Sequence, residues 1–449
     1  MPSRPQGPAP RSAVRLELAR ALGQFALAPL QLADYAMRRA SLRLELAALL
    51  ESPARIDPAP TPRAPARSLR VFVSCAEHSG QIHAVNVTRA VQRTLAAGGA
   101  PSASFAGLGG ASLAQAGVEL LANPVERAMM GFGGVLQALP WYLKLLESCA
   151  AHFRDARPDV AILIDSPALH VPLGRIARRY GVKVLHFVTP QHWAWAPWRT
   201  GGYARSVDRA LTILPFEPEW FRRRGVAVAH VGHPLQDRLA SVARASHPSA
   251  SPCLALLPGS RARVIELNLP WMLATALRVQ ERVPGLAVRI LQENAEHQGC
   301  IAEIVARARA SERVEIGAGE IHTSLRGASA ALSVSGTVLL DLLHHRLPTV
   351  SIYRISNARD TLAYRTLLTA PWFSSINLLA SREVVPEYCF RGRGPQDEVV
   401  EALVGLLMDP ERRRTALRGL ELAAERLGPA GACQRAALHA LELACEAPA

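Results

Sequence analysis

The chain has 449 residues, 49% of them hydrophobic, which is enough for two or three domains with their own cores. It carries 51 lysines and arginines against 37 acidic residues. The formal charge of +14 favours an anionic partner: nucleic acid, an acidic membrane surface or a phosphorylated substrate. Scattered arginines and the lack of zinc-finger or ribonucleoprotein motifs argue against nucleic acid. No apolar run reaches the roughly 18 residues of a membrane span, and the seven cysteines form no CxxC pair, which is typical of reduced thiols in a cytosolic protein.

Residues 1–66 form an N-terminal extension with a composition of its own. Its first segment, MPSRPQGPAPRSA, is rich in proline and free of acids, which indicates disorder. Apolar residues at helical spacing then predict one or two amphipathic helices interrupted at Pro29, and a proline-rich linker ends near Ser68. Such helices could lie on a membrane or pack back on the core, and of the two we expect packing.

From residue 67 the chain alternates between short apolar strands and helical or loop segments, the pattern of a parallel sheet covered by helices. Five strands are predicted in residues 67–240: LRVFVSC, VAILID, VKVLHFV, RALTILPF and AVAHVG. Five more are predicted in residues 241–449, after a polar linker near 240–252: CLALLPG, LAVRILQ, RVEIGAG, AALSVSG and PTVSIY. We therefore predict an α/β protein of two doubly wound, Rossmann-like domains that face a cleft, with helices after Pro395 closing the second domain.

Two strand ends of the first domain carry residues suited to chemistry. Glu77 follows the first strand, and Ser79 and Gly80 could start a helix whose N–H groups bind an anion or a sugar; a plain capped helix is the alternative. Asp165 ends the strand VAILID, so its carboxylate would point from the sheet edge into the cleft. Partial burial would raise its pKa and suit a general base, although it could equally cap the next helix.

Two turns of the second domain are suited to a diphosphate. In LLPGSR, small residues lead from a strand into a helix and Arg261 supplies a fork of donors. In SVSGTVLLD, Ser335, Gly336 and Thr337 open another helix directly after a strand. Ordinary capped helices are the alternative for each turn. The chain lacks an Asp-x-Asp pair, a Walker A sequence and a GxGxxG motif, so we expect a nucleotide site that uses neither a metal ion nor a cofactor.

An aromatic cluster follows the strand VKVLHFV. Residues 187–198, FVTPQHWAWAPW, hold three of the seven tryptophans, among them Trp193 and Trp195. Ligands bind at the carboxyl ends of strands in open α/β sheets, so these indoles could form the wall of a site. Core packing is the alternative.

Taken in order, the motifs AEHSGQIHA, FAGLGGASLAQAG, RPDVAILIDSPALH, FVTPQHWAWAPWR, LPFEPEWF, VGHPLQD, LLPGSR, SVSGTVLLD and SINLLASREVVPE resemble the lipid-A-disaccharide synthase family. The resemblance runs from about residue 70 to at least residue 390. It implies a GT-B fold and an inverting glycosyltransferase. It also implies that Asp165 is the catalytic base, that the tryptophan loop lines the substrate cleft, and that Asn377 and Glu387 join the nucleotide-binding residues.

The resemblance further implies the reaction and the partners. The family joins UDP-2,3-diacylglucosamine to 2,3-diacylglucosamine 1-phosphate, which gives a 1,6-linked disaccharide in the β configuration and UDP. The expected partners are therefore a UDP-activated acylated glucosamine, a lipid acceptor and an anionic membrane surface, with the enzyme peripheral on the inner face of the inner membrane. The stretch AMMGFGGVLQALPWYLKLL, residues 128–146, would offer apolar surface to acyl chains, or else form a buried helix.

Some positions depart from the family's usual residues: Gln81, Val264, Asp341 and Phe390, and the run Ala168–Leu169–His170 in place of Asp-Phe-Asn. His170 is thereby a rival to Asp165 as the base. Three other functions stay open: a UDP-sugar epimerase, a transferase to another lipid acceptor, and a non-catalytic homologue. The sequence leaves the oligomeric state open.

Overall fold

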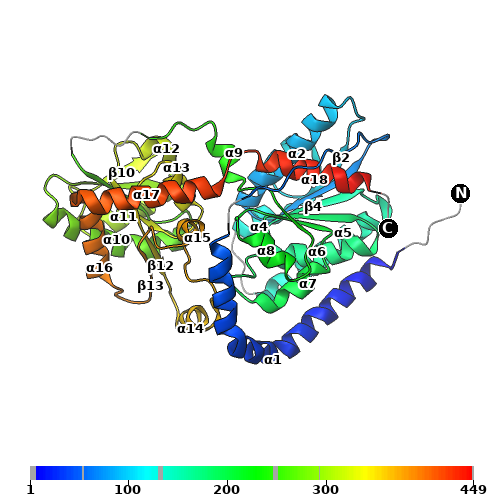
Figure 1. Ribbon diagram of the computed structural model, residues 1–449, viewed down its shortest axis with the longest axis horizontal. Coiled ribbons are helices and arrows are strands. Elements are labelled where there is room, and N and C mark those ends of the chain that lie inside the picture. The colour runs from blue at the N-terminus through cyan, green and yellow to red at the C-terminus, as the bar shows by residue number, and fades with distance from the viewer. Residues whose placement is uncertain (1–6, 53–54, 130–134, 246–250, 293, 447–449) are drawn as a thin grey trace, which may run out of the picture. The chain divides into compact units, whose positions relative to one another are not determined.

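The computed structural model describes residues 7–52, 55–129, 135–245, 251–292 and 294–446, and the chain divides into two units (Figure 1). Unit 1 combines Met1–Asp237 with Pro429–Ala449, and unit 2 is Arg238–Gly428. The predicted linker at 240–252 and the predicted apolar stretch at 128–146 lie partly outside the described residues. None of the helices in the described ranges has the length and apolar character of a membrane span.

A seven-stranded parallel sheet forms the centre of unit 1, in the order β3-β2-β1-β4-β5-β6-β7. Its strands are β1 (Arg70–Cys75), β2 (Ser104–Leu108), β3 (Val118–Ala122), β4 (Val160–Ile164), β5 (Lys183–Phe187), β6 (Arg209–Thr212) and β7 (Val228–His230). The helices of this unit are α1 (Pro10–Leu50), α2 (His78–Ala97), α3 (Ala111–Gln115), α4 (Pro124–Met129), α5 (Val135–Asp155), α6 (Pro167–Arg179), η1 (Pro197–Arg199), α7 (Thr200–Ala204), α8 (Glu217–Arg222) and α18 (Ala432–Cys445). The chain passes from unit 1 into unit 2 within α9 (Leu235–Leu239).

Unit 2 has a six-stranded parallel sheet in the order β10-β9-β8-β11-β12-β13. Its strands are β8 (Cys253–Leu257), β9 (Ala287–Gln292), β10 (Glu315–Ala318), β11 (Ala330–Val334), β12 (Thr349–Arg354) and β13 (Glu387–Phe390). Its helices are α10 (Ala262–Arg282), η2 (Ala295–His297), α11 (Gln298–Arg307), α12 (Ile321–Ser324), α13 (Val338–His344), α14 (Ala358–Leu367), α15 (Ser375–Ala380), α16 (Gln396–Met408) and α17 (Pro410–Leu427). Two doubly wound α/β sheets are thus present, as predicted.

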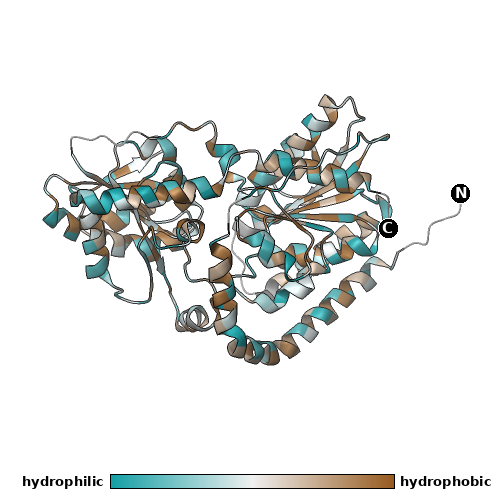
Figure 2. Cartoon of the chain, in the orientation of Figure 1, coloured by the Kyte–Doolittle hydropathy of each residue, from teal (hydrophilic) through white to brown (hydrophobic). Residues whose placement is uncertain are grey.

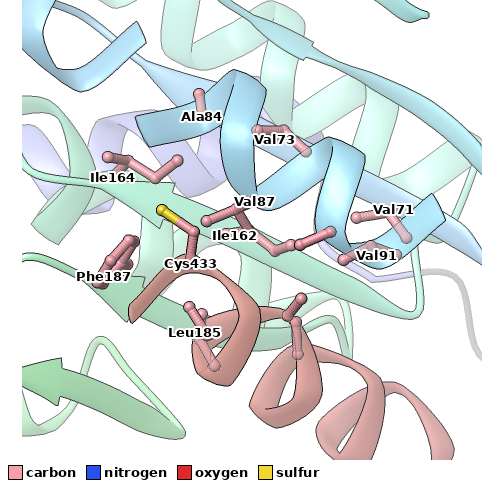
Figure 3. Packing of buried hydrophobic residues seen from close by; sticks show 14 of the residues in the cluster. Val71, Val73, Ala84, Val87, Val91, Ile162, Ile164, Leu185, Phe187 and Cys433 are labelled. Atoms are coloured by element: carbon pink, nitrogen blue, oxygen red, sulfur yellow. The ribbon is translucent and has the colours of Figure 1, made fainter. Parts of the chain in front are cut away.

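The last helix belongs to unit 1, which corrects the predicted second domain of residues 241–449. Figure 3 shows Cys433 of α18 packed among Val87 of α2 and strand residues such as Ile162 and Leu185. α18 is rich in alanine, and small side chains let a helix lie close to a sheet. The Asp237 carboxylate caps the helix by accepting N–H bonds from residues 431–433.

The helix α1 of the extension is continuous through Pro29, where an interruption was predicted, although Figure 1 shows that it bends. Proline has no N–H for the carbonyl four residues earlier, which explains the bend. Near one end of α1, buried Glu17 pairs with Arg175 of α6 at 2.7 Å. Near the other end, Glu45 pairs with Arg224 at 2.8 Å. The extension therefore packs against unit 1 through its two ends.

All ten predicted strands are present, whereas β2, β3 and β13 were missed. β2 has the sequence SFAGL, with little of the β-branched character that marks a strand. Its Gly107 lies so close to β1 that an added Cβ would come within 1.7 Å of the Val73 carbonyl oxygen. Close approach between strands, and not strand propensity, selects glycine at this position.

Candidate functional site

The predicted site residues of unit 1 lie at the topological switch point, where the strand order of the sheet reverses. β1 and β4 are neighbours, and the strands that follow each of them continue to opposite sides. Glu77 comes just after the carboxyl end of β1, and Asp165 just after that of β4. Ligands of open α/β sheets bind outside the strand ends at such a switch point. The topology thus brings these two carboxylates to one edge of the sheet.

Asp165 lies on a strained turn. Its φ is +53° and that of Ser166 is +46°, a left-handed conformation that non-glycine residues seldom adopt. The Asp165 N–H donates to the Phe187 carbonyl oxygen at 2.9 Å, which ties the turn to the end of β5. Strain of this kind persists only where the surroundings hold it, and it gathers at functional sites.

Two buried histidines hold the Asp165 backbone. His170 Nδ1 and His186 Nε2 lie 2.6 Å and 2.9 Å from the Asp165 carbonyl oxygen. A carbonyl can only accept, so both nitrogens must carry protons. The remaining nitrogens then accept from the Ser74 and Tyr203 hydroxyls, at 2.8 Å and 2.9 Å. Every ring nitrogen of the pair is therefore used, and both imidazoles are neutral.

The electrostatics favour a base at Asp165. Burial raises the pKa of the Asp165 carboxyl above its usual value, and the negative charge of Glu77 raises it further, while the Ser166 N–H opposes both. A carboxylate that binds protons more readily than usual is better suited to take one from a hydroxyl. The Glu77 side chain itself is exposed.

His170 is excluded as the rival base. The side chain is only 1% exposed, and burial lowers its pKa to about 3. Because both of its nitrogens are bonded inside the protein, no nitrogen is left to receive a substrate proton. Its contribution is to position Asp165.

The start of α2 differs in detail from the prediction. Helix α2 begins at His78 with Glu77 as its N-cap, so Ser79 and Gly80 lie within the first turn and do not cap it. Ser79 is exposed and Gly80 is buried. Gln81, one of the departures from the family pattern, is buried and accepts a hydrogen bond from the Gly110 N–H at 2.6 Å. This amide therefore holds the loop after β2.

The tryptophan loop divides its side chains between core and surface. Trp193 is only 2% exposed, so it is a core residue and not part of a site wall. Its indole N–H donates to Glu217 at 3.0 Å, and its ring meets Phe216 edge-on. Trp195, by contrast, is 40% exposed and is free to contact a ligand. The loop starts at Val188, which has a φ of +67°, a costly conformation for a β-branched residue.

Glu217 is a buried acid that our interpretation of the sequence missed. Its carboxylate accepts from the Ile213 and Leu214 N–H groups, at 2.9 Å each, and from Trp193. Burial raises the pKa of Glu217 to about 7 against the effect of these bonds. The motif LPFEPEWF contained the signal, since an acid amid apolar residues must find partners when it is buried. Glu217 thus joins the tryptophan loop to the loop after β6.

In unit 2 the two predicted turns also meet at a switch point. β8 and β11 are neighbours, and the strands beyond them again run to opposite sides. Arg261 follows β8 as the N-cap of α10, and no ion pair ties its exposed guanidinium to any side chain in the described part of the chain. Gly259 has a φ of +115°, and a Cβ there would lie 2.6 Å from Val264 Cγ1, so the turn requires glycine. Val264, where the family usually has an acid, packs under this turn.

The second turn lies beside the first. Ser335 follows β11 and donates its N–H to the Ile352 carbonyl oxygen at 2.9 Å, while Gly336 and exposed Thr337 lead into α13. In the same unit, Gln292 and His297 donate to the Gly259 and Ser260 carbonyl oxygens, at 3.0 Å and 3.1 Å. These bonds fix the first turn. Within the described ranges, no cluster of three or more histidine, cysteine or acidic side chains is arranged to hold a metal ion.

Asn377 and Glu387 are brought together, 3.0 Å apart. Asn377 is fully buried and uses its amide on the backbone at 384 and 385. Glu387 accepts from the Phe373 and Ser374 N–H groups, and burial raises its pKa to about 7. The pair shapes the segment between α14 and β13, and its contact with a substrate stays a prediction.

Asp341 and Phe390, two further departures, have internal partners. Asp341 is buried and pairs with Arg238 at 2.5 Å, with His322 Nε2 3.9 Å away. Phe390 packs against Trp271 with ring centroids 4.8 Å apart. Both side chains therefore contribute to the packing of unit 2.

A pocket of about 340 Å³ lies elsewhere in unit 1, between α1 and the η1–α7 segment. Its lining includes Tyr35 and Arg38 of α1, with Trp198, Thr200 and Arg224 from the body of the unit. Neither Asp165 nor Glu77 lines it. This pocket is therefore a feature of the extension, separate from the strand ends.

Comparison with known proteins gives one consistent result. The family model described as lipid-A-disaccharide synthetase matches residues 71–440. The lipid-A-disaccharide synthase of Myxococcus xanthus is 35% identical over 83% of this chain and 97% of its own length. That of Chromohalobacter salexigens is 34% identical over 82% of this chain and 95% of its own.

Solved structures agree on the fold. The S. aureus MnaA–UDP co-structure has a TM-score of 0.54 at 11% identity and covers 82% of this chain and 94% of its own. The calicheamicin glycosyltransferase CalG4 has a TM-score of 0.50 at 13% identity, over 81% of this chain and 96% of its own. These likenesses confirm the predicted GT-B type of α/β fold. With most of its length matched by the family model and by close relatives, the chain belongs to the lipid-A-disaccharide synthase family.

Proposed function

We propose that this chain joins UDP-2,3-diacylglucosamine to 2,3-diacylglucosamine 1-phosphate, forming the lipid A disaccharide 1-phosphate and releasing UDP. The observation that carries the proposal is Asp165, a partly buried carboxylate with a raised pKa on a strained turn at the switch point of unit 1. The two substrates are inferred from the family to which the chain belongs. The departures at Gln81, Val264 and Phe390 have partners inside the protein, so these three substitutions do not argue against this chemistry.

In the proposed mechanism, Asp165 takes the proton from the acceptor's primary hydroxyl as the hydroxyl oxygen attacks the anomeric carbon of the donor. The bond from that carbon to the β-phosphate oxygen breaks, and UDP leaves with the electron pair. Attack opposite the leaving group inverts the anomeric configuration. General-base assistance of this kind contributes roughly 10² to 10⁴ in rate.

Unit 2 is proposed to hold the leaving group. The Arg261 guanidinium and the turn at Ser335, Gly336 and Thr337 would donate hydrogen bonds to the diphosphate. The negative charge that develops on the diphosphate would then be stabilised by an arginine and by helix N-termini. Asn377 and Glu387 are proposed to support the nucleotide side of the same site. In this scheme no metal ion is required.

The enzyme is also proposed to work as a peripheral protein on the inner face of the inner membrane, where its two lipid substrates would be found. The formal charge of +14 supports contact with anionic lipid. Trp195 is the exposed indole of the tryptophan loop and is proposed to contact the substrates.

Incubation of the protein with both substrates tests the proposal. UDP release that depends on the acceptor, with formation of a disaccharide product, is the expected result. UDP-N-acetylglucosamine alone is a further control, because an epimerase would act on it without an acceptor. No product with the family substrates would refute the proposed reaction.

A further inference from the structure

The helix α1 carries an apolar surface that the rest of unit 1 leaves uncovered. Large hydrophobic side chains are exposed at thirteen of the described positions, and eight of these lie on α1: Leu16, Leu22, Phe25, Leu27, Leu30, Leu32, Met37 and Leu44. Isolated exposed apolar residues are ordinary, but a gathering of this size marks an interaction surface. α1 also lies outside residues 71–440, the range that matches the family model.

The apolar character is strongest around the bend of α1. Residues 21–33, ALGQFALAPLQLA, contain no charged side chain and are bounded by Arg20 and Asp34. Leu22, Phe25 and Leu30 are 62%, 82% and 69% exposed. Figure 2 shows the ribbon of α1 largely brown, the hydrophobic colour, around this bend.

The direction of these side chains indicates the kind of partner. At about 100° per residue, the exposed apolar residues of 21–33 spread over roughly 220° of the helix circumference. A helix that packs on one protein surface needs a narrower apolar stripe. A segment that is apolar around more than half of its circumference suits surroundings that are themselves apolar on several sides, as the acyl region of a bilayer is.

The anchoring of α1 leaves the bend available. Arg11 of α1 pairs with Glu147 at 2.8 Å, and Glu17 pairs with Arg175. Beyond the bend, the Tyr35 ring lies 5.2 Å from that of Trp198, at the end of the tryptophan loop. The two ends of the helix are thus held to unit 1. The bend between them is the part of α1 that can enter a lipid surface.

The charges that flank the bend favour an anionic surface. α1 has six arginines and three acids. The buried carboxylate of Glu17 is shared by Arg20 at 2.6 Å and Arg175 at 2.7 Å, so positive charge is in excess at this end. On the other side, exposed Arg38 lies 3.6 Å from exposed Asp34, and Arg39 follows it in the chain. Arginines placed beside an apolar segment can reach headgroup phosphates.

We propose that residues 21–33 of α1 insert into the interfacial region of an anionic phospholipid bilayer, with Arg20 and Arg38 on the headgroup phosphates. This inference rests on the proposed function, which places the enzyme on a membrane, and it names the segment that makes the membrane contact. Through Trp198, the inserted helix touches the loop that carries Trp195. Insertion would therefore hold a predicted substrate-binding loop of unit 1 beside the membrane that contains the substrates.

Sedimentation of the full chain with vesicles tests the proposal. The vesicles contain phosphatidylglycerol and phosphatidylethanolamine, and phosphatidylcholine vesicles serve for comparison. The variant L22Q/F25Q/L30Q removes three apolar side chains but keeps good helix formers. Its binding should fall by about tenfold per side chain that enters the apolar region. The matched control L362Q/M408Q, at two exposed apolar positions of unit 2, should bind like the parent chain.

The charge is tested separately. The variant R20Q/R38Q should weaken binding to the anionic vesicles by roughly fivefold per arginine and leave binding to phosphatidylcholine almost unchanged. Equal loss on both kinds of vesicle would contradict the assigned contact with headgroup phosphates. Circular dichroism of each variant confirms that α1 is still helical.

Two further measurements separate the alternatives. Light scattering of the parent chain and of L22Q/F25Q/L30Q shows whether the apolar face joins two copies of the chain; an oligomer that dissociates on substitution would overturn the proposal. UDP release is measured with detergent-dispersed substrates. A parent chain that turns over substrate but does not bind vesicles refutes the insertion alone. A chain that binds vesicles through α1 but releases no UDP refutes the proposed reaction alone.

Discussion

Replacement of Asp165 by asparagine tests the proposed base with little disturbance of the fold. Asparagine tolerates the left-handed conformation of this position, where φ is +53°, about as well as aspartate does. The bonds that His170 and His186 make go to the backbone carbonyl oxygen and are kept. The substitution therefore removes the proton acceptor and leaves the turn in place.

The expected loss in turnover is the full general-base contribution, roughly 10² to 10⁴. UDP affinity should stay near that of the parent protein, because the nucleotide is proposed to bind to unit 2. Asp155→Asn is the matched control, since Asp155 is an exposed carboxylate at the end of α5 and pairs only with Arg154 among the described residues. Its turnover should be unchanged.

The pH dependence of kcat/KM gives a second test. Deprotonated Asp165 is the active form, so activity should fall as the pH drops through the pKa of this carboxyl, which lies above the usual value for aspartate. Glu77→Gln removes the neighbouring charge that raises this pKa, so the acid limb should move to lower pH. Burial is the larger cause of the shift, and the limb should stay above its position for an ordinary aspartate.

UDP release is followed from about pH 4 to pH 9, with saturating donor and varied acceptor, across the titration range of carboxyl and imidazole groups. Retention of more than about a tenth of the parental turnover in Asp165→Asn would refute the assignment. An acid limb that does not move in Glu77→Gln would show that another group controls it.

Three further predictions concern the nucleotide site and the core. Arg261→Ala should weaken UDP binding by about 1.5 to 3 kcal/mol, or about 10- to 150-fold by calorimetry. Arg263→Ala, an exposed arginine in the first turn of α10, should not; equal effects of the two substitutions would mean a purely long-range charge contribution. EDTA should leave turnover unchanged, and a strict Mg²⁺ requirement would contradict the proposed site. The pKa of Glu217 is about 7 in the folded protein, against 4.5 for an ordinary glutamate, so the folded state binds more protons between these values. Its contribution to the unfolding free energy then falls by about 3 kcal/mol as pH rises across that range. In urea titrations, Glu217→Gln should abolish this dependence and the half-buried neighbour Glu219→Gln should not.

Much of the fold was accessible from the sequence because its strands are buried on both faces. Runs such as VAILI in β4 and CLALL in β8 are apolar throughout, and helices cover both sides of a parallel sheet. β3 was missed because it lies at the edge of its sheet, where its residues are mostly half-buried and the apolar run is broken. The return of α18 to unit 1 rests on contacts with residues far earlier in the chain, such as the cap at Asp237 nearly 200 residues before it, and local patterns do not encode such contacts.

The sequence predicted which strand ends the candidate side chains follow, but not the contacts that each side chain makes. Topology alone brings Glu77 and Asp165, and likewise Arg261 and Ser335, to neighbouring strand ends. Which indole of the tryptophan loop points inward depends on the left-handed turn at Val188 and on the buried partner Glu217. Neither the turn nor that pairing is visible in the residue pattern.

The strained turns of unit 1 and its buried histidines form one arrangement. The left-handed residues Asp165, Ser166 and Val188 follow the adjacent strands β4 and β5. Each such conformation costs about 1 to 3 kcal/mol, so the surroundings must offset several kcal/mol at this edge. His170 and His186 can do so only as neutral rings with assigned tautomers, which burial ensures by lowering their pKa values to about 3 and 4. The proposed base Asp165, held in this way, would lose little freedom when a substrate arrives, so the strain at this strand end is consistent with the proposed mechanism.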